Sequence, residues 1–264
     1  MVIDFHTHAF PQAIAARAMT SLLEEGKEIY TPVHDGTLAG LLKNMDDWNI
    51  DISIVQPVLT KPSQMQKINE RARIICSERI ISFGAIDPHA DDYKSQIDFV
   101  VSLGLKGLKF HAEYQNFSID DKRMLKIYDY ALSKGLIIFH HAGFDPAYPA
   151  PYKSSPKQFA AISDAMQGGV IVAAHLGGQS QWDEVEKYLT GKNIYLDTSM
   201  GFEFFPHDQF LRIAKAHGAD KILFGSDSPW SNAKTEIEHL QALPLTAGEK
   251  EGIFYKNAQR ILNL

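Results

Sequence analysis

Short apolar segments alternate with longer stretches of helical pattern along most of the chain. Eight apolar segments are rich in Ile, Val, Leu and Phe, and they cover residues 2–8, 52–58, 80–86, 107–111, 136–141, 170–175, 194–199 and 222–227. Continuous apolar runs of this length are typical of parallel strands that are covered on both faces. The pattern therefore predicts eight buried parallel strands.

Helical spacing follows each predicted strand. We predict helices near residues 12–25, 37–48, 63–77, 93–103, 121–133, 182–189, 209–217, 235–243 and 248–262. The fifth strand is followed by a proline-rich loop, in which Ser155 and Pro156 read as the cap and first position of a further helix. Eight strand-then-helix units match an α/β (β/α)8 TIM barrel. A doubly wound open sheet, the competing architecture, usually has fewer strands, so we predict a single barrel domain over residues 1–264.

Composition narrows the possible functions. The chain has 264 residues and a formal net charge of −6, which gives no basic face for nucleic acid. No apolar run reaches the roughly 18 residues that a membrane span needs, and no secretory signal pattern opens the chain. The single cysteine, Cys76, excludes an internal disulfide. We therefore expect a cytoplasmic protein that acts on a small molecule and binds neither nucleic acid nor membrane.

The stretch "DFHTH" places two histidines one residue apart at the end of the first strand. Residues i and i+2 of a strand share a face, so His6 and His8 point the same way and can bind one ion. Asp4 should share that face, one layer deeper. A pair of histidines alone is weak evidence, because two incidental imidazoles at a strand end give the same pattern.

Four other predicted strands also end in ionisable residues, which are Lys109 and His111, His140 and His141, His175, and Asp227. A TIM barrel brings the C-terminal ends of its strands together around the active site. Imidazoles with one carboxylate suit zinc and also accept manganese, iron, cobalt or nickel. A metal with an open position lowers the pKa of bound water to about 7. The sequence therefore predicts a metal-dependent enzyme.

The motifs "DFHTH", "GLKFH", "FHHAG", "AAHLGG" and "LFGSDSPW" together resemble the amidohydrolase superfamily. They are most similar to its amidohydrolase-related branch, which includes enzymes like aminocarboxymuconate semialdehyde decarboxylase. The resemblance implies a TIM barrel that holds one divalent metal, with zinc expected. It implies the metal ligands His6, His8, His141 and Asp227. It also implies His175 as acid–base or substrate-polarising residue and Asp227 as general base.

Several assignments stay open. Strand alternation permits either His140 or His141 as the ligand. Lys109 resembles a lysine that is carboxylated and bridges two metals in binuclear members, so two metals are the alternative to one. A structural role for Lys109, in an ion pair with Glu113, is also open. His111 either lines the pocket or is a buried structural residue. The histidines away from strand ends are expected to face solvent; these are His34, His89, His207, His217 and His239.

The leading functional prediction is a hydrolase in which a metal-activated water cleaves a C–N or C–O bond. The alternative is a non-oxidative decarboxylase of a small aromatic or unsaturated acid. That reaction needs cations to hold an anionic substrate; Lys109, Lys61 and Lys153 are available, but no arginine ends a strand. A metal-binding barrel without catalysis is the third hypothesis. A homodimer is a further expectation from the resemblance.

Overall fold

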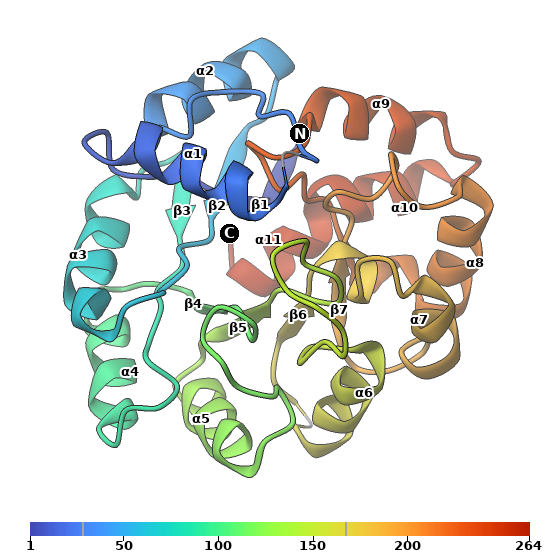
Figure 1. The fold of residues 1–264 in the computed structure, drawn as a ribbon. Coiled ribbons are helices and arrows are strands. Elements are labelled where there is room, and N and C mark those ends of the chain that lie inside the picture. The colour runs from blue at the N-terminus through green and yellow to red at the C-terminus, as the bar shows by residue number, and fades with distance from the viewer. Residues whose placement is uncertain (28, 167) are drawn as a thin grey trace.

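The computed structural model describes residues 1–27, 29–166 and 168–264. Eight parallel strands occupy its centre, and a ring of helices surrounds them (Figure 1). The strands are β1 (Ile3–Thr7), β2 (Ile52–Val55), β3 (Ile80–Ser82), β4 (Gly107–Phe110), β5 (Ile137–His140), β6 (Ile171–Ala173), β7 (Tyr195–Asp197) and β8 (Ile222–Leu223). They pair in chain order as two groups, β1-β2-β3 and β4-β5-β6-β7-β8.

Backbone hydrogen bonds join the two groups at both seams. Between β3 and β4, the Gly84 amide donates to Gly107 O and the Lys109 amide donates to Gly84 O, each at 2.8 Å. Between β8 and β1, the Phe5 amide donates to Phe224 O (2.8 Å) and the Asp227 amide donates to His6 O (2.7 Å). The strands therefore form a closed ring, which confirms the predicted (β/α)8 barrel and excludes the open sheet.

The helices follow the predicted order. They are α1 (Ala15–Glu25), α2 (Leu38–Trp48), α3 (Met65–Ile75), α4 (Tyr93–Ser102), α5 (Lys122–Ser133), α6 (Pro156–Ala165), α7 (Trp182–Tyr188), α8 (His207–His217), α9 (Ala233–Ala242), α10 (Ala247–Glu251) and α11 (Asn257–Leu262). Ser155 caps α6 as predicted, because its amide donates to the Gln158 side chain (2.9 Å) and Pro156 takes the first position. The predicted last helix is divided by a π-helical turn, Gly252–Lys256, between α10 and α11. No helix in the described ranges is long and apolar enough to cross a membrane.

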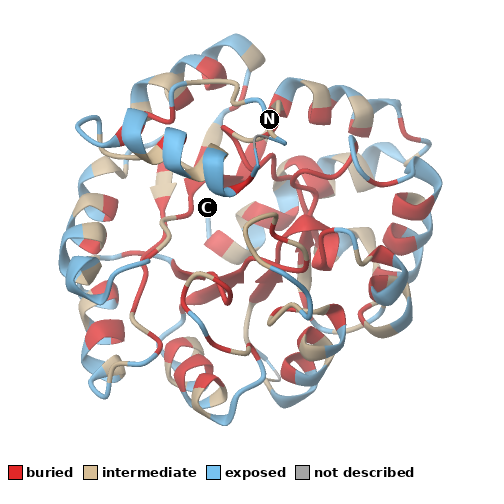
Figure 2. Ribbon diagram, in the orientation of Figure 1, coloured by how far each residue is buried: buried red, intermediate tan, exposed pale blue. Residues whose placement is uncertain are grey.

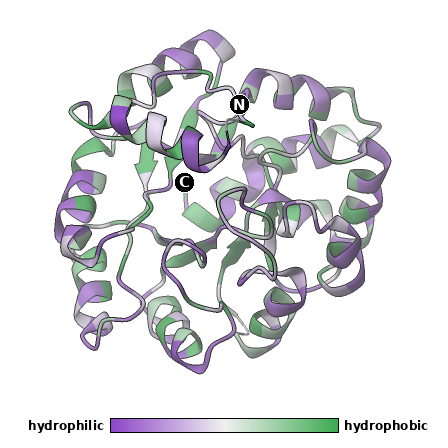
Figure 3. Ribbon diagram, in the orientation of Figure 1, coloured by the Kyte–Doolittle hydropathy of each residue, from purple (hydrophilic) through white to green (hydrophobic). Residues whose placement is uncertain are grey.

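The hydrophobic core has two layers. Phe5, Phe83 and Phe139 fill the barrel, with Phe5 edge-on to Phe83 and stacked on Phe139. A larger layer lies between the strands and the inner faces of the helices, where buried and apolar residues gather (Figures 2 and 3). Because side chains pack the barrel interior, polar chemistry is confined to its ends.

One of the histidines expected to face solvent is part of this core. His217 is 6% exposed, and its two ring nitrogens lie 3.2 Å from Leu189 O and 2.9 Å from Ile194 O. The expectation was wrong for His217 because it ends α8 on the face that packs against these two carbonyls.

Glu236 on α9 is fully buried, and its Oε2 accepts from the Phe202 amide (3.3 Å). Burial is the main reason that its pKa rises from 4.5 to about 8, although the Phe202 hydrogen bond opposes the rise. The native state then holds a proton that the unfolded chain releases above pH 4.5. This carboxyl therefore lowers stability as pH rises from about 4.5 to about 8.

We predict that Glu236→Gln removes this pH dependence. Because one pKa unit corresponds to about 1.4 kcal/mol, the rise from 4.5 to about 8 means that the variant should gain on the order of 5 kcal/mol over wild type at pH 9 and little at pH 4. Urea unfolding of both proteins at pH 4, 7 and 9 measures the difference. A stability difference that is the same at all three pH values would contradict the prediction.

Candidate active site

β1 and the segment after β8 bring three predicted site residues together at the C-terminal ends of the strands. His6 Nε2 lies 3.1 Å from Asp227 Oδ1, and His8 Nε2 lies 2.8 Å from the same oxygen. His6 is 1% exposed and Asp227 is 7% exposed. Since i and i+2 share a face, the structure places both imidazoles against one carboxylate, as the strand alternation predicted.

Hydrogen bonds on the far side of each ring indicate which nitrogen carries the proton. His8 Nδ1 lies 2.8 Å from Gln56 O, and His6 Nδ1 lies 3.0 Å from Asp197 Oδ2. A carbonyl and a carboxylate only accept hydrogen bonds, so both Nδ1 atoms donate. Burial also holds the pKa of His6 well below 6.5, so its ring is neutral. The neutral ring of His6 therefore turns the lone pair of Nε2 toward Asp227, and the His8 tautomer with its proton on Nδ1 does the same.

The Nε2 atoms of His6 and His8 thus face Asp227 Oδ1 at 3.1 and 2.8 Å. Asp227 Oδ1 is buried and has no hydrogen-bond donor among the described residues. Two ligand atoms bound to one ion at about 2.1 Å lie about 3.0 Å apart at octahedral angles and about 3.4 Å apart at tetrahedral angles, so the spacing is close to that of a divalent metal site.

His175 lies beside this group. Its ring centroid is 5.3 Å from that of His6, and its Nε2 is 3.1 Å from His141 Nδ1. His175, Leu176 and Asp227 have φ values of 56°, 53° and 67°. Non-glycine residues rarely adopt this left-handed conformation, and such strain is concentrated at functional sites.

His140, the last residue of β5, and His141, which follows it, point in opposite directions. His140 stacks on Phe110 with ring centroids 5.2 Å apart and lies in the outer apolar layer, where neither ring nitrogen has a partner among the described residues. Burial lowers its pKa to about 3, so the ring is neutral. His141 instead contacts His175, and its buried Nε2 is free of hydrogen bonds to the described residues.

His111 stacks on His141 with ring centroids 4.2 Å apart and an interplanar angle of 13°. His111 Nε2 also lies 3.3 Å from Asp145 Oδ2, so these three residues form a second buried cluster. Nearly parallel rings direct their lone pairs along separate planes. His111 and His141 therefore do not converge on one ion in this arrangement, and His111 lines the site as a stacking partner.

Lys109 is 2% exposed, and its Nζ lies 3.4 Å from His6 Nε2 and 4.4 Å from the Phe139 ring centroid. Burial lowers its pKa to about 8, although Asp227 and Asp197 oppose this. No carboxylate oxygen of the described residues lies within 4.0 Å of it. The ion pair with Glu113 is absent, because Glu113 accepts from the Lys153 amide instead (2.7 Å).

Several residues of the site were not recognised in the sequence. They are Gln56, Arg71, Asp145, Asp197 and Ser199. The motif "LDTS" at the end of the seventh strand was the available signal for Asp197 and Ser199, since it places a carboxylate at the active-site end of the barrel. Gln56 contributes a backbone carbonyl, and Arg71 reaches Ala9 O (3.0 Å) from α3, so neither has a sequence signal.

The family assignment agrees with this geometry. Residues 3–264 match the model of one protein family, which is described as Amidohydrolase. The chain belongs to the amidohydrolase family. No curated protein sequence matches it.

Solved structures similar to this amidohydrolase share its barrel. An uncharacterised TIM-barrel protein from Bordetella bronchiseptica is 19% identical, with a TM-score of 0.78 and coverage of 99% of this chain and 98% of that one. A manganese-bound 5-carboxyvanillate decarboxylase from Novosphingobium aromaticivorans is 15% identical (TM-score 0.71; 100% and 97% covered). A probable 2-pyrone-4,6-dicarboxylic acid hydrolase from Acinetobacter baumannii is also 15% identical (TM-score 0.69; 100% and 99% covered). At these identities the likeness shows the shared fold.

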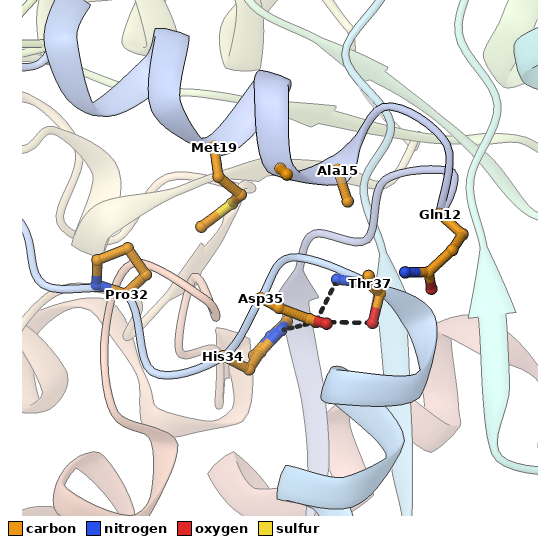
Figure 4. Close-up of a pocket in the computed structure, with 8 residues that line it drawn as sticks. Gln12, Ala15, Met19, Pro32, His34, Asp35 and Thr37 are labelled. Carbon is orange, nitrogen blue, oxygen red and sulfur yellow. Dashed lines mark hydrogen bonds and ion pairs between the residues drawn. The ribbon is translucent and has the colours of Figure 1, made fainter.

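A pocket of about 300 Å³ lies outside the histidine cluster, between α1 and the segment before α2 (Figure 4). Its lining includes Met19, Pro32, His34, Asp35 and Thr37, and none of the predicted site residues. His34 was expected to face solvent, but its side chain is 4% exposed and its Nε2 contacts Ser228 Oγ at 3.1 Å. The pocket therefore borders the C-terminal end of the barrel through His34 but lies apart from the candidate active site.

The neighbouring histidines of β5 make a matched pair for mutagenesis. His141→Ala removes the imidazole that faces the site, so we expect metal affinity to fall at least about tenfold. His140→Leu changes only the outer apolar layer, so metal affinity should be unchanged and stability should change by less than about 1.5 kcal/mol. Zn²⁺ competition titration and urea unfolding test both variants. Equal loss of affinity in the two would contradict the orientation.

Proposed function

We propose that this amidohydrolase is a metal-dependent hydrolase that cleaves a C–N or C–O bond of a small molecule. The observation that carries the proposal is the convergence of His6 Nε2, His8 Nε2 and Asp227 Oδ1, without a hydrogen-bond donor for that oxygen among the described residues. Such a donor set suits one divalent metal, with zinc as our proposed ion and His141 as the further ligand.

When bound, the metal would polarise the substrate and lower the pKa of a water molecule. Asp227 directs Oδ1 at the two imidazoles, which leaves Oδ2 to take the proton of the attacking water and pass it to the leaving group. His175 and His141 form a hydrogen-bonded pair (3.1 Å), through which a proton can move between the two rings. We propose this pair as the second acid–base group.

The hydrogen bonding of the pair also frees His141 for the metal. His175 Nδ1 lies 2.9 Å from Ser199 Oγ and 3.3 Å from Ser199 O. Ser199 Oγ in turn donates to Asp197 Oδ1, so it accepts from His175. A neutral His175 then accepts at Nε2 from His141 Nδ1, which leaves the lone pair of His141 Nε2 unprotonated.

A decarboxylase is the second candidate, and two cations favour it. Lys109 is buried beside His6, and the half-buried Arg71 binds Ala9 O directly after His8. Neither has a carboxylate within 4.0 Å among the described residues, so both are available for an anionic substrate. Arg71 supplies the arginine that the strand ends lack. The decarboxylase with a similar barrel is consistent with this reaction in the same fold.

Two features of the proposal need separate measurements. A second metal would require carboxylated Lys109, which intact-protein mass spectrometry and a metal-to-protein ratio would detect. The homodimer and the cytoplasmic location stay predictions; light scattering coupled to gel filtration tests the first.

We predict that metal and Asp227 are both required for turnover. Removal of metal with a chelator should abolish activity, and Zn²⁺ or Mn²⁺ should restore it. Asp227→Asn should lower kcat/KM by about 10²–10⁴-fold through loss of the base. Activity that survives complete metal removal, checked by elemental analysis, would contradict the proposal.

The products distinguish the two reactions. A panel of esters, lactones, amides and unsaturated or aromatic acids is incubated in ¹⁸O-labelled water and followed by mass spectrometry. Hydrolysis predicts one labelled oxygen in the product and no CO₂. Release of CO₂ without label at the reacting carbon would establish the decarboxylase instead. Turnover of no compound would favour a metal-binding barrel without catalysis.

A further inference from the structure

Asp197, the last residue of β7, is fully buried at the centre of the site. Its two oxygens have separate partners. Oδ1 accepts from the His175 amide and the Ser199 amide, each at 2.9 Å, and from the Ser199 hydroxyl. Oδ2 contacts His6 Nδ1 at 3.0 Å. One carboxylate therefore holds the strained turn at His175 and also one histidine of the proposed metal site.

The contact with His6 determines which nitrogen of that ring is protonated. A buried carboxylate without its own proton only accepts, so His6 Nδ1 must donate. Ser199 Oγ also lies 3.0 Å from His6 Nδ1, but its hydroxyl proton goes to Asp197 Oδ1, so it accepts as well. With the proton on Nδ1, the lone pair of Nε2 faces Asp227.

We propose that Asp197 is a positioning residue that fixes the Nδ1–H tautomer of His6 and thereby makes Nε2 a metal ligand. The claim that Nε2 binds the metal rests on the proposed function. The tautomer itself can be measured in the metal-free protein. Carboxylates that orient metal-binding histidines typically change metal affinity by 10–100-fold when they are replaced.

Asp197→Asn tests this assignment with almost no change in shape. The three donors at Oδ1 require an acceptor, so the amide oxygen must take that side. The NH₂ group then faces His6 Nδ1 and turns the nitrogen into an acceptor. His6 must move its proton to Nε2, where it blocks the lone pair that faces Asp227.

Ser199→Ala is the matched control. It removes a hydroxyl that contacts Asp197, His6 Nδ1 and His175 Nδ1, but it keeps the carboxylate opposite His6. A purely structural role of the cluster predicts similar effects for the two variants. A tautomer role predicts that only Asp197→Asn moves the proton of His6.

Two-bond ¹H–¹⁵N NMR of the metal-free proteins at pH 8 reports the tautomer, with His6→Gln used to assign the signal. We expect Nδ1–H in wild type and Ser199→Ala, and Nε2–H in Asp197→Asn. Zn²⁺ competition should show about 10–100-fold weaker binding for Asp197→Asn, with urea unfolding of the metal-free form close to wild type.

An Nε2–H signal in wild type, or an Nδ1–H signal kept in Asp197→Asn, would overturn the proposal. The proposal would also be overturned if Asp197→Asn changed the tautomer of His6 but left the Zn²⁺ affinity unchanged. If wild type binds no Zn²⁺ at all, the proposed function fails, while the NMR result still decides the role of Asp197. The two failures are therefore distinguishable.

Discussion

The site depends on an electrostatic conflict between three closely spaced atoms. The Nε2 atoms of His6 and His8 and the Oδ1 atom of Asp227 are all electron-rich, and they face one another at 2.8–3.1 Å. The partners of the two Nδ1 atoms, Asp197 and Gln56 O, prevent the rings from offering a proton without becoming charged. In the proposed site, a divalent cation would remove the repulsion and bind all three atoms. Without a bound cation the arrangement is unfavourable, and the Lys109 ammonium, 3.4 Å from His6 Nε2, offsets the cost only in part.

Closure of the barrel fixes the positions of His6, His8 and Asp227. β1 and β8 meet at the seam, where the Asp227 amide donates to His6 O and the His8 amide donates to Ser228 O, both at 2.7 Å. Asp4 braces the seam one layer deeper, since its carboxylate accepts from the Ser226 amide (2.9 Å) and hydroxyl (2.6 Å). The proposed ligands therefore cannot separate unless the first and last strands part, so the site should form with the barrel and persist with it.

The sequence predicted the parts of this arrangement that a single strand specifies. Apolar runs indicated the strands, and alternation placed His6 and His8 on one face. It could not choose between His140 and His141, because that choice depends on the neighbouring strands. Phe139 points into the barrel with Phe5, and His140 pairs in register with the outward-facing Phe110. This register turns His141 toward the site.

The groups that set the tautomers of His6 and His8 could not be predicted from the sequence, for a related reason. The partner of His6 Nδ1 lies 191 residues away, and the partner of His8 Nδ1 is a backbone carbonyl. Neither leaves a local pattern. The solvent-facing prediction for His34 and His217 was wrong because folded loops and helix ends cover them, which residue type alone does not indicate.

The proposed metal ligands do not by themselves separate hydrolysis from decarboxylation, since either reaction can use a Lewis acid and a carboxylate base. The difference must come from groups that recognise substrate charge. Lys109 contributes from inside the barrel and Arg71 from α3, on the side of β1 where His8 lies. A neutral ester or amide gains little from two unpaired cations, whereas a carboxylate would compensate the cost of burying Lys109. The charge of the substrate, more than the metal, should therefore decide which reaction this barrel performs.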